Sequence, residues 1–266
     1  MNTFDDITKK VEEIAYNPKS IGLKGGVMGA VLFFMYYQRF SANGRYEEIS
    51  YNLLDDIILK ISANNSFDYA NGIVGIGNTL LFLTEEKFVD FDSDGFFNDL
   101  DKIVLSKLKS NIVVNFSHDT GIIGLSRYAL NRPIKIDAVQ HTLNQIKKGI
   151  EETICGINPV FLYPSEILQD IKLFSLEIGE IKEFQEQITT INKTIEYFEK
   201  NNSILQSSCS EYKTIQQLRE AEIRKDNNKI KSLLTSIEKG SSDAVLQGLA
   251  YMNTRKPALP QWWKLY

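Results

Sequence analysis

The sequence predicts an all-α protein, and three observations lead to that prediction. Apolar side chains recur at helical spacing over most of the 266 residues, as Val27, Val31 and Phe34 do on one helix face. Strand signals are confined to two short stretches, Val113–Val114 and Pro159–Tyr163. Prolines are few, and most of them lie in or beside connections. About twelve helices joined by short connections account for this pattern.

The expected helices follow the apolar periodicity along the chain. An acidic, amphipathic segment, MNTFDDITKKVEEI, opens the sequence. An apolar segment starts at Gly22, and an amphipathic helix follows from Arg45 to Ser62. A second apolar segment starts at Tyr69. Further helices are expected at residues 94–110, 121–130, 137–153, 165–178, 182–200, 211–225, 229–238 and 243–253.

Composition and charge exclude several classes of function. The net charge is −4 and the basic residues are scattered, so no face for nucleic acid is expected. The longest apolar run, Gly25 to Tyr37, has about 13 residues, whereas a membrane-spanning helix needs about 20. The two cysteines, Cys155 and Cys209, form no CxxC pair, which suits a reducing compartment. No signal peptide is recognisable, and a cytoplasmic protein is therefore expected.

A Gly-x-x-Gly core recurs three times at nearly equal intervals in the first half of the chain. Its copies are GLKGGVMGAVLFFMYYQRF, YANGIVGIGNTLLFLTEEKF and HDTGIIGLSRYALNR, with a weaker fourth copy, LQGLAYMN, near the C-terminus. A more polar helix follows each of the first two copies. The repeat therefore predicts pairs of helices, one apolar and one amphipathic, in an inner and an outer layer. The paired glycines are Gly26/Gly29, Gly72/Gly75 and Gly121/Gly124.

The glycine run from Gly72 to Gly77 resembles a phosphate-binding loop, but its context argues against one. Such a loop follows a buried strand, whereas residues 64–69 are polar and predict a loop. No Lys-Ser/Thr pair follows, as a Walker motif requires. Since a glycine inside a helix costs about 1 kcal/mol relative to alanine, its recurrence indicates a steric demand. We expect the glycines to let neighbouring helix backbones approach closely.

These glycine-started helices resemble those of the lanthionine synthetase C-like (LanC-like) family. The stretch NGIVGIGNTLLFLTEEKFVDFDSDGFFNDLDKIV is similar to the family's second repeat, HDTGIIGLSRYALNR to its third, and GLAYMNTRKPALPQWWKLY to its closing repeat. The resemblance implies an α/α toroid, a double-layered ring of helical hairpins. It would comprise one domain over residues 1–266, with the best-matching repeats at 22–132, a divergent helical part at 133–240 and a closing repeat at 241–266.

The resemblance also implies a chemistry that this sequence does not support. Cyclases of the family hold one zinc ion with two cysteines and a histidine, and they add peptide cysteine thiols to dehydrated Ser or Thr residues. The zinc ion keeps the thiol as a thiolate at neutral pH. Here Cys155 is followed by Gly156 and Cys209 by Ser210, so the Cys-His motif is missing. A degenerate toroid without a zinc cofactor and without the cyclase reaction is expected.

The expected function is that of an accessory protein, or pseudoenzyme, in the maturation of a ribosomally synthesised, post-translationally modified peptide. It would bind the precursor peptide or a modifying enzyme through the rim of the toroid. Two alternatives stay open. One is an active peptide-modifying enzyme, with a zinc site relocated among the histidines and cysteines or with a histidine in acid/base work. The other is a helical binding module unrelated to peptide modification. The rim residues are Lys24, Asp68, Asn71, His118 and Asp119.

His118 and Asp119 stand just before a glycine-started helix and have two interpretations. The pair can act as an acid/base or as metal ligands. Alternatively, Ser117, Asp119 or Thr120 caps the helix beside a partly exposed histidine. Trp262 and Trp263 are expected to anchor the C-terminal segment, with a partner contact as the alternative.

The acidic stretch from Asp90 to Asp101 has the pattern D-x-D-x-D-G-x-x-N-x-x-D, which resembles a calcium loop. The last position holds Asp, whose shorter side chain is a poorer bidentate ligand than Glu. An acidic linker at the N-terminus of a helix also explains the stretch, since negative charge is favourable there. Calcium binding is kept as the minority interpretation. Its candidate ligands are Asp90, Asp92, Asp94, Asn98 and Asp101.

Overall fold

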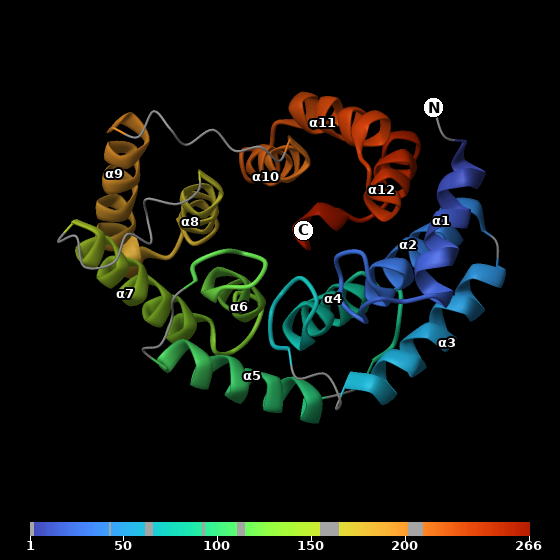
Figure 1. Ribbon diagram of the computed structural model, residues 1–266, viewed down its shortest axis with the longest axis horizontal. Coiled ribbons are helices and arrows are strands. Elements are labelled where there is room, and N and C mark those ends of the chain that lie inside the picture. Colours follow the sequence, from blue (N-terminus) through green and yellow to red (C-terminus); the bar gives the residue numbers. More distant parts are fainter. Residues whose placement is uncertain are drawn as a thin grey trace. The chain divides into compact units, whose positions relative to one another are not determined.

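The computed structural model describes residues 3–42, 44–61, 66–91, 94–110, 115–154, 165–201 and 210–266, and within these ranges the protein is all helical, with no strand (Figure 1). The prediction of an all-α protein is confirmed. The two stretches with strand signals, Val113–Val114 and Pro159–Tyr163, lie outside the described residues. No helix in the described ranges is long and apolar enough to cross a membrane.

Twelve α-helices and two 3-10 turns make up the described structure. The nine helices predicted with both bounds match to within three residues at each end, whereas the apolar segments expected from Gly22 and Tyr69 become helical only at Val27 and Ile73. The helices are Phe4–Tyr16 (α1), Val27–Ser41 (α2), Gly44–Ile61 (α3), Ile73–Glu85 (α4), Asp94–Lys109 (α5), Ile122–Ala129 (α6), Lys135–Ile154 (α7), Ser165–Glu177 (α8), Gln185–Asn201 (α9), Ser210–Ile223 (α10), Asn227–Gly240 (α11) and Ala244–Arg255 (α12), and the 3-10 turns are Lys182–Phe184 (η2) and Trp262–Lys264 (η3).

The chain folds into two compact units. Unit 1 contains residues 1–92 and 217–266, and unit 2 contains residues 93–216. The first boundary falls between the second and third glycine-started helices, and the second falls inside α10. The prediction of a single domain over residues 1–266 stays a prediction, and each unit is described by itself below.

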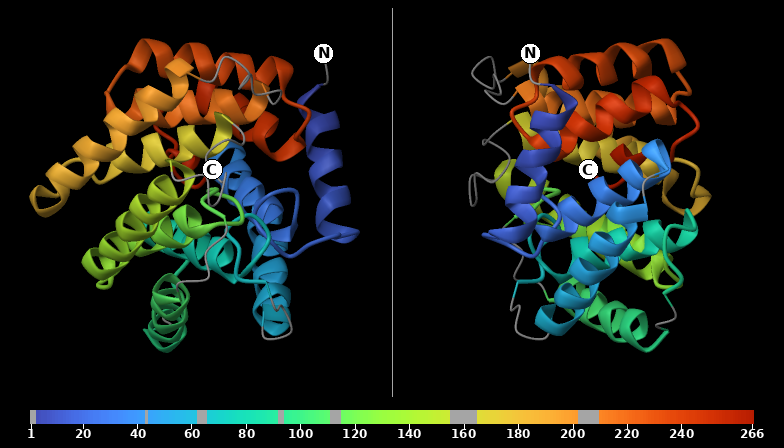
Figure 2. Two further views of the ribbon diagram at one scale, coloured as in Figure 1. Left: turned by 60° about the vertical axis from the view of Figure 1, so that its left-hand side comes forward. Right: turned by 90° about the vertical axis from the view of Figure 1, so that its right-hand side faces the viewer.

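Unit 1 is built around α2, which packs against α1, α3, α4 and α12 (Figure 1). Every residue from Val27 to Tyr36 is buried, so α2 has no face left for solvent. The partner helix α3 is amphipathic and buries Leu53 and Ile57 while its acidic positions stay exposed. Helices α11 and α12 run side by side, as both views of Figure 2 show. The predicted pairing of an apolar with an amphipathic helix is therefore present in α2 and α3.

Unit 2 repeats this pairing on a smaller scale. Helix α6 is short, and every residue from Ile122 to Ala129 is buried. It packs against α5, α7 and α8, and α9 in turn packs against α7 and α8 (Figure 1). The amphipathic helix α7 buries Leu143 and Ile146 and exposes its lysines. The buried α6 therefore fixes the position of the loop that precedes it, which carries His118.

Candidate functional site

The three glycine-started helices share one loop conformation. The first glycine of each pair is the N-cap residue of its helix, and it has an extended backbone in all three copies. The residue after that glycine donates its N–H to the carbonyl of the residue six positions before the glycine. These bonds join Val27 to Ser20 at 3.0 Å, Ile73 to Ser66 at 3.0 Å and Ile122 to Asn115 at 3.1 Å. The first-glycine angles φ and ψ are −118° and −175° at Gly26, −103° and −174° at Gly72, and −116° and −169° at Gly121.

In each loop a polar side chain accepts a hydrogen bond from the backbone of the same loop. The side-chain oxygen of Ser20, Ser66 or Asn115 accepts the backbone N–H two residues further along, at 3.0, 3.4 and 2.9 Å. One short polar residue therefore uses both its side chain and its carbonyl to hold the loop. The repeat recognised from the sequence begins at Gly22, Tyr69 and His118 and therefore misses this residue. A Ser or Asn six positions before the first glycine is the signal that identifies it.

The glycines make room for the chain's own loop. A Cβ on Gly72 would lie 2.5 Å from the backbone nitrogen of Asp68 and 2.6 Å from its carbonyl oxygen. A Cβ on Gly26 or Gly121 would collide with its own loop in the same way, and one on Gly75 would collide with the carbonyl of Tyr69. The interpretation that these glycines admit a neighbouring helix is therefore wrong. It does hold for the fourth copy, where a Cβ on Gly248 of α12 would meet the Phe33 ring of α2.

Three of the five predicted rim residues lie in two loops of unit 1 that contact each other. Lys24 belongs to the loop before α2, and Asp68 and Asn71 belong to the loop before α4. The N–H groups of Leu23 and Lys24 both donate to the carbonyl of Ala70, each at 2.9 Å. The first loop therefore lies against the second, and the side chain of Asn71 is exposed at the junction.

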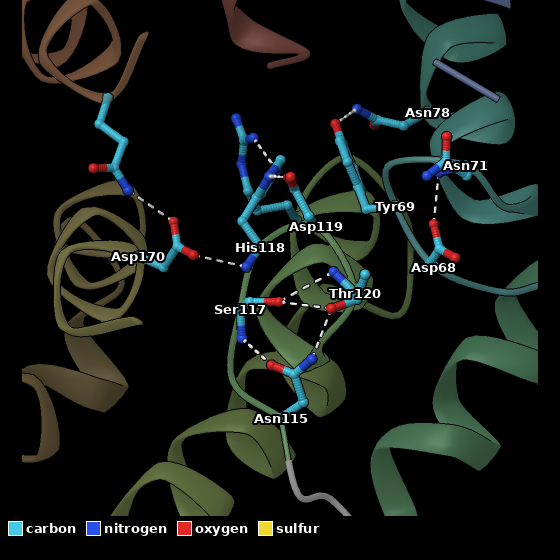
Figure 3. A network of polar contacts seen from close by, with 12 residues as sticks. Asp68, Tyr69, Asn71, Asn78, Asn115, Ser117, His118, Asp119, Thr120 and Asp170 are labelled. Carbon is cyan, nitrogen blue, oxygen red and sulfur yellow. Dashed lines mark hydrogen bonds and ion pairs between the residues drawn. The ribbon is translucent and has the colours of Figure 1, made fainter. Parts of the chain in front are cut away.

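Asp68 has a structural task in its loop (Figure 3). Its Oδ1 accepts the N–H groups of Asn71 at 2.6 Å and Gly72 at 3.1 Å, and its Oδ2 accepts the hydroxyl of Ser66. In the third loop Ser117 has the same position, and its hydroxyl accepts the N–H of Thr120 at 3.1 Å. These bonds satisfy backbone donors just before a helix, which are otherwise without an intrahelical partner. The Asp68 side chain therefore holds its own loop together.

His118 is buried, with a relative exposure of 1%. It stands three residues before its first glycine, and the residues at that position in the other loops, Leu23 and Tyr69, are equally buried. The interpretation of a partly exposed histidine beside a capping side chain is therefore wrong. The N-cap residue of α6 is Gly121, which makes no side-chain bond to the helix.

The contacts of His118 determine its tautomer (Figure 3). Its Nε2 lies 2.7 Å from Nη1 of Arg127, and its Nδ1 lies 3.0 Å from Oδ1 of Asp119. A guanidinium can only donate hydrogen bonds, so Nε2 must be the acceptor. Nδ1 then carries the hydrogen and donates it to Asp119. His118 is therefore a neutral imidazole with both ring nitrogens engaged.

The network around His118 continues into α8 and α10. Arg127 Nε lies 3.2 Å from Oε2 of Glu177, and the backbone N–H of His118 donates to Oδ2 of Asp170 at 2.8 Å. The other oxygen of Asp170 accepts from the side-chain amide of Gln216 at 2.9 Å, as Figure 3 shows. An acid/base or ligand role for His118 would require the bond to Arg127 to break. The geometry fits a residue that holds its loop against α8, with only Asp119, 33% exposed, accessible at the surface.

The described side chains do not fit a zinc ion. Within the described ranges, no group of three or more His, Cys, Asp or Glu residues could hold a metal ion. Cys155 and Cys209 lie outside those ranges, so a relocated site that uses them is not tested and stays a prediction.

The calcium alternative also stays a prediction. Asp92 lies outside the described residues, and Asp90 and Asn98 are exposed. Asp101, 5% exposed, contacts Arg132 Nη2 at 3.0 Å and accepts from the hydroxyl of Tyr128 at 2.8 Å. The positive charge of Arg132 therefore already compensates the charge of the Asp101 carboxylate. Asp94 begins α5, so the ligand candidates from Asp94 to Asp101 lie along a helix and not in a loop.

A groove between α7 and α9 in unit 2 was not foreseen from the sequence. It has a volume of about 280 Å³, and both apolar and polar side chains line it. No residue of the predicted rim lines it. Its lining residues are Leu143, Asn144, Lys147, Glu186, Gln187, Thr190 and Ile191.

Comparison with known proteins gave no match. No family model matches the chain, and neither the curated proteins nor the solved structures include one that does. The functional argument therefore relies on the loops and helices described above.

Proposed function

We propose that this protein is a LanC-like accessory protein that binds the precursor of a ribosomally synthesised, modified peptide and works without the cyclase zinc. One observation carries the proposal. A loop with the same two hydrogen bonds from the residue six before its glycine precedes three buried helices, and each of these is followed in the chain by an amphipathic helix. This repetition supports an α/α toroid of helical hairpins as the architecture.

The loops before α2 and α4 are the surface to which we assign peptide binding. Lys24 and Asn71 lie on these two loops, which contact each other through the carbonyl of Ala70. A lysine and an exposed amide next to helix N-termini favour carboxylate and carbonyl groups of an extended peptide. In the third loop, Asp119 offers the opposite charge. The catalytic alternative receives no support from His118, whose ring nitrogens are both engaged.

Peptide binding is tested with a fluorescently labelled synthetic copy of the precursor encoded nearest to this protein's gene. Fluorescence polarisation gives the dissociation constant for the native chain and for Lys24→Ala combined with Asn71→Ala. We expect the double substitution to weaken binding roughly tenfold, as loss of two well-placed interface side chains does. Lys239→Ala is the matched control, because Lys239 is an exposed lysine on α11 of the same unit. Equal losses in both variants, or no binding by the native chain, would count against the proposal.

The zinc-free character has its own test. Metal content is measured on the purified native protein and on Cys155→Ser and Cys209→Ser. We expect substoichiometric zinc in all three. One zinc per chain that disappears with either cysteine would favour the alternative of an active enzyme.

A further inference from the structure

The segment after α12, residues 257–266, buries its large apolar side chains although it is mostly irregular; we call it the tail. It contains one 3-10 turn, η3, and belongs to unit 1. Trp262 is fully buried, and Trp263 and Tyr266 are 3% and 2% exposed. The tail follows α12 and ends at the C label of Figure 1. The prediction that the two tryptophans anchor the C-terminal segment agrees with this burial.

Side chains hold the tail by its backbone, as a binding site holds an extended peptide. The hydroxyl of Tyr36, on α2, donates to the carbonyl of Pro260 at 2.9 Å. The amide of Asn253, on α12, donates to the carbonyls of Leu259 and Pro260, each at 3.2 Å. Recognition of consecutive carbonyls by side-chain donors, with aromatic residues buried beside them, is typical of peptide sites.

The end of the tail reaches the first glycine-started loop. The hydroxyl of Tyr266 donates to the carbonyl of Leu23 at 3.5 Å, and it lies 3.6 Å from where a Cβ on Gly29 would be. Burial raises the pKa of Tyr266 well above its ordinary value, so the hydroxyl keeps the proton that it donates. Leu23 is next to Lys24. The tail therefore ends at the loop to which peptide binding is assigned.

The fit of the tail is incomplete. Among the described residues, the indole Nε1 atoms of Trp262 and Trp263 are buried without a hydrogen-bond partner, and so is Oδ1 of Asn253. Buried indole N–H groups usually find an acceptor, and leaving one without an acceptor opposes burial. The tail is therefore held less firmly than the area that it buries would suggest.

We propose that the tail is an intramolecular peptide ligand that occupies a peptide-binding surface of unit 1 and is displaced by an incoming peptide. The surface consists of Tyr36, Asn253 and the loop around Leu23. It suits an extended peptide that has a proline followed by aromatic residues, as the tail does. This inference rests on the proposed function for the identity of the natural competitor, the precursor peptide.

The test combines a defect in the tail with a peptide added in trans. The full chain with Trp262→Ala is mixed with synthetic PALPQWWKLY, the sequence of residues 257–266. The substitution alone should lower Tm by on the order of 10 °C, because a large buried side chain is lost. Saturating peptide should restore about half of that loss by mass action. The native chain should show little change in Tm, because its own tail already fills the site.

Two controls separate specific filling from general stabilisation. A peptide with alanine at the position of Trp262 should restore nothing. Ile146→Ala, which damages the core of unit 2, should not respond to either peptide. Where Trp262→Ala does not fold, Tyr266→Ala replaces it, and the labelled peptide should bind that variant at least roughly tenfold more tightly than the native chain. No rescue of Trp262→Ala and equal affinities for Tyr266→Ala and the native chain would overturn the inference.

The precursor peptide distinguishes this inference from the proposed function. Displacement of labelled PALPQWWKLY from Trp262→Ala by the precursor supports both. Rescue by the tail peptide without any binding of the precursor supports the tail site and contradicts the proposed function. Precursor binding with the same affinity for the native chain and Trp262→Ala shows that the precursor binds elsewhere. That result would overturn displacement by the precursor and leave the proposed function intact.

Discussion

Replacing His118 with leucine should destabilise unit 2 if the histidine holds its loop and does not take part in catalysis. Leucine occupies the equivalent position, Leu23, in the first loop, so the backbone accepts it and little volume is lost. The cost comes from Arg127, whose Nη1 loses the acceptor Nε2 at a site that is 8% exposed. Taking an acceptor from a buried charged donor costs about 1–3 kcal/mol, and we expect about 2 kcal/mol here.

A double-substitution cycle isolates the bond between the two side chains. Arg127→Leu alone removes the partner of Glu177, which is 14% exposed, and breaking a buried ion pair costs about 3–5 kcal/mol. The double variant should be more stable than the sum of the single losses predicts, by about 1–2 kcal/mol. The sign follows because both single substitutions break the same bond between Nε2 of His118 and Nη1 of Arg127, and the double variant loses it only once.

Urea unfolding measures these losses and also assigns them to a unit. Both tryptophans of the chain, Trp262 and Trp263, belong to unit 1, whereas far-UV circular dichroism reports on helices of both units. We expect His118→Leu to lower the urea concentration at which the dichroism changes more than the concentration at which tryptophan fluorescence changes. His141→Leu is the control, because this half-buried histidine of α7 should change stability by less than about 0.5 kcal/mol. Native stability of His118→Leu, or strict additivity with Arg127→Leu, would refute the structural role.

Three other predictions follow from local geometry. Gly72→Ala should lower stability by about 2 kcal/mol through its clash with the preceding loop, whereas Gly95→Ala, with open space at its Cβ, should raise it by about 0.5–1 kcal/mol; thermal unfolding measures both. Burial and the bond to Asp101 raise the pKa of Tyr128 above 10.0, so its contribution is complete below that pH and is lost as the pH rises further; the alkaline fall in stability should be shallower in Tyr128→Phe. Phe4→Ala should cost about 2 kcal/mol in a urea titration, because its ring stacks on a tyrosine of α12 at 4.4 Å.

The sequence predicted the helices well because their signal is local. The apolar spacing of α7 placed that helix at 137–153, and the structure has it at Lys135–Ile154. The recurring Gly-x-x-Gly core located three helix starts. The loops before them were missed because Ser20, Ser66 and Asn115 do the same task with two residue types, and the bonds go to the backbone.

The burial of His118 was missed for a different reason. Its partners Arg127 and Asp170 stand nine and 52 residues further along the chain, and only the packing of α6 on α8 brings them to it. No spacing rule connects those positions. Alignment within the repeat would have given the answer, since the residues at the same position, Leu23 and Tyr69, are apolar and aromatic. The site predictions were weakest wherever a side chain meets a distant element.

Comparison of the three loops indicates where function can differ between them. Two bonds recur in all three loops, and both are made by the polar residue six positions before the first glycine. The fourth residue before the first glycine varies with the neighbour that the loop meets. It is Gly22 where a Cβ would strike the backbone of Asn71, Asp68 in the second loop and Ser117 in the loop beside α8.

The two residues directly before the first glycine also differ between the loops. They are Lys24 and Gly25 in the first loop, Ala70 and Asn71 in the second, and Asp119 and Thr120 in the third. Their side chains differ in charge from positive through neutral to negative. Apart from Ala70 they are half-buried or exposed, so they can meet a partner at little cost to the fold. Substitutions at Lys24, Asn71 or Asp119 should therefore change binding more than stability, whereas substitutions at the polar residue six before the glycine should do the reverse.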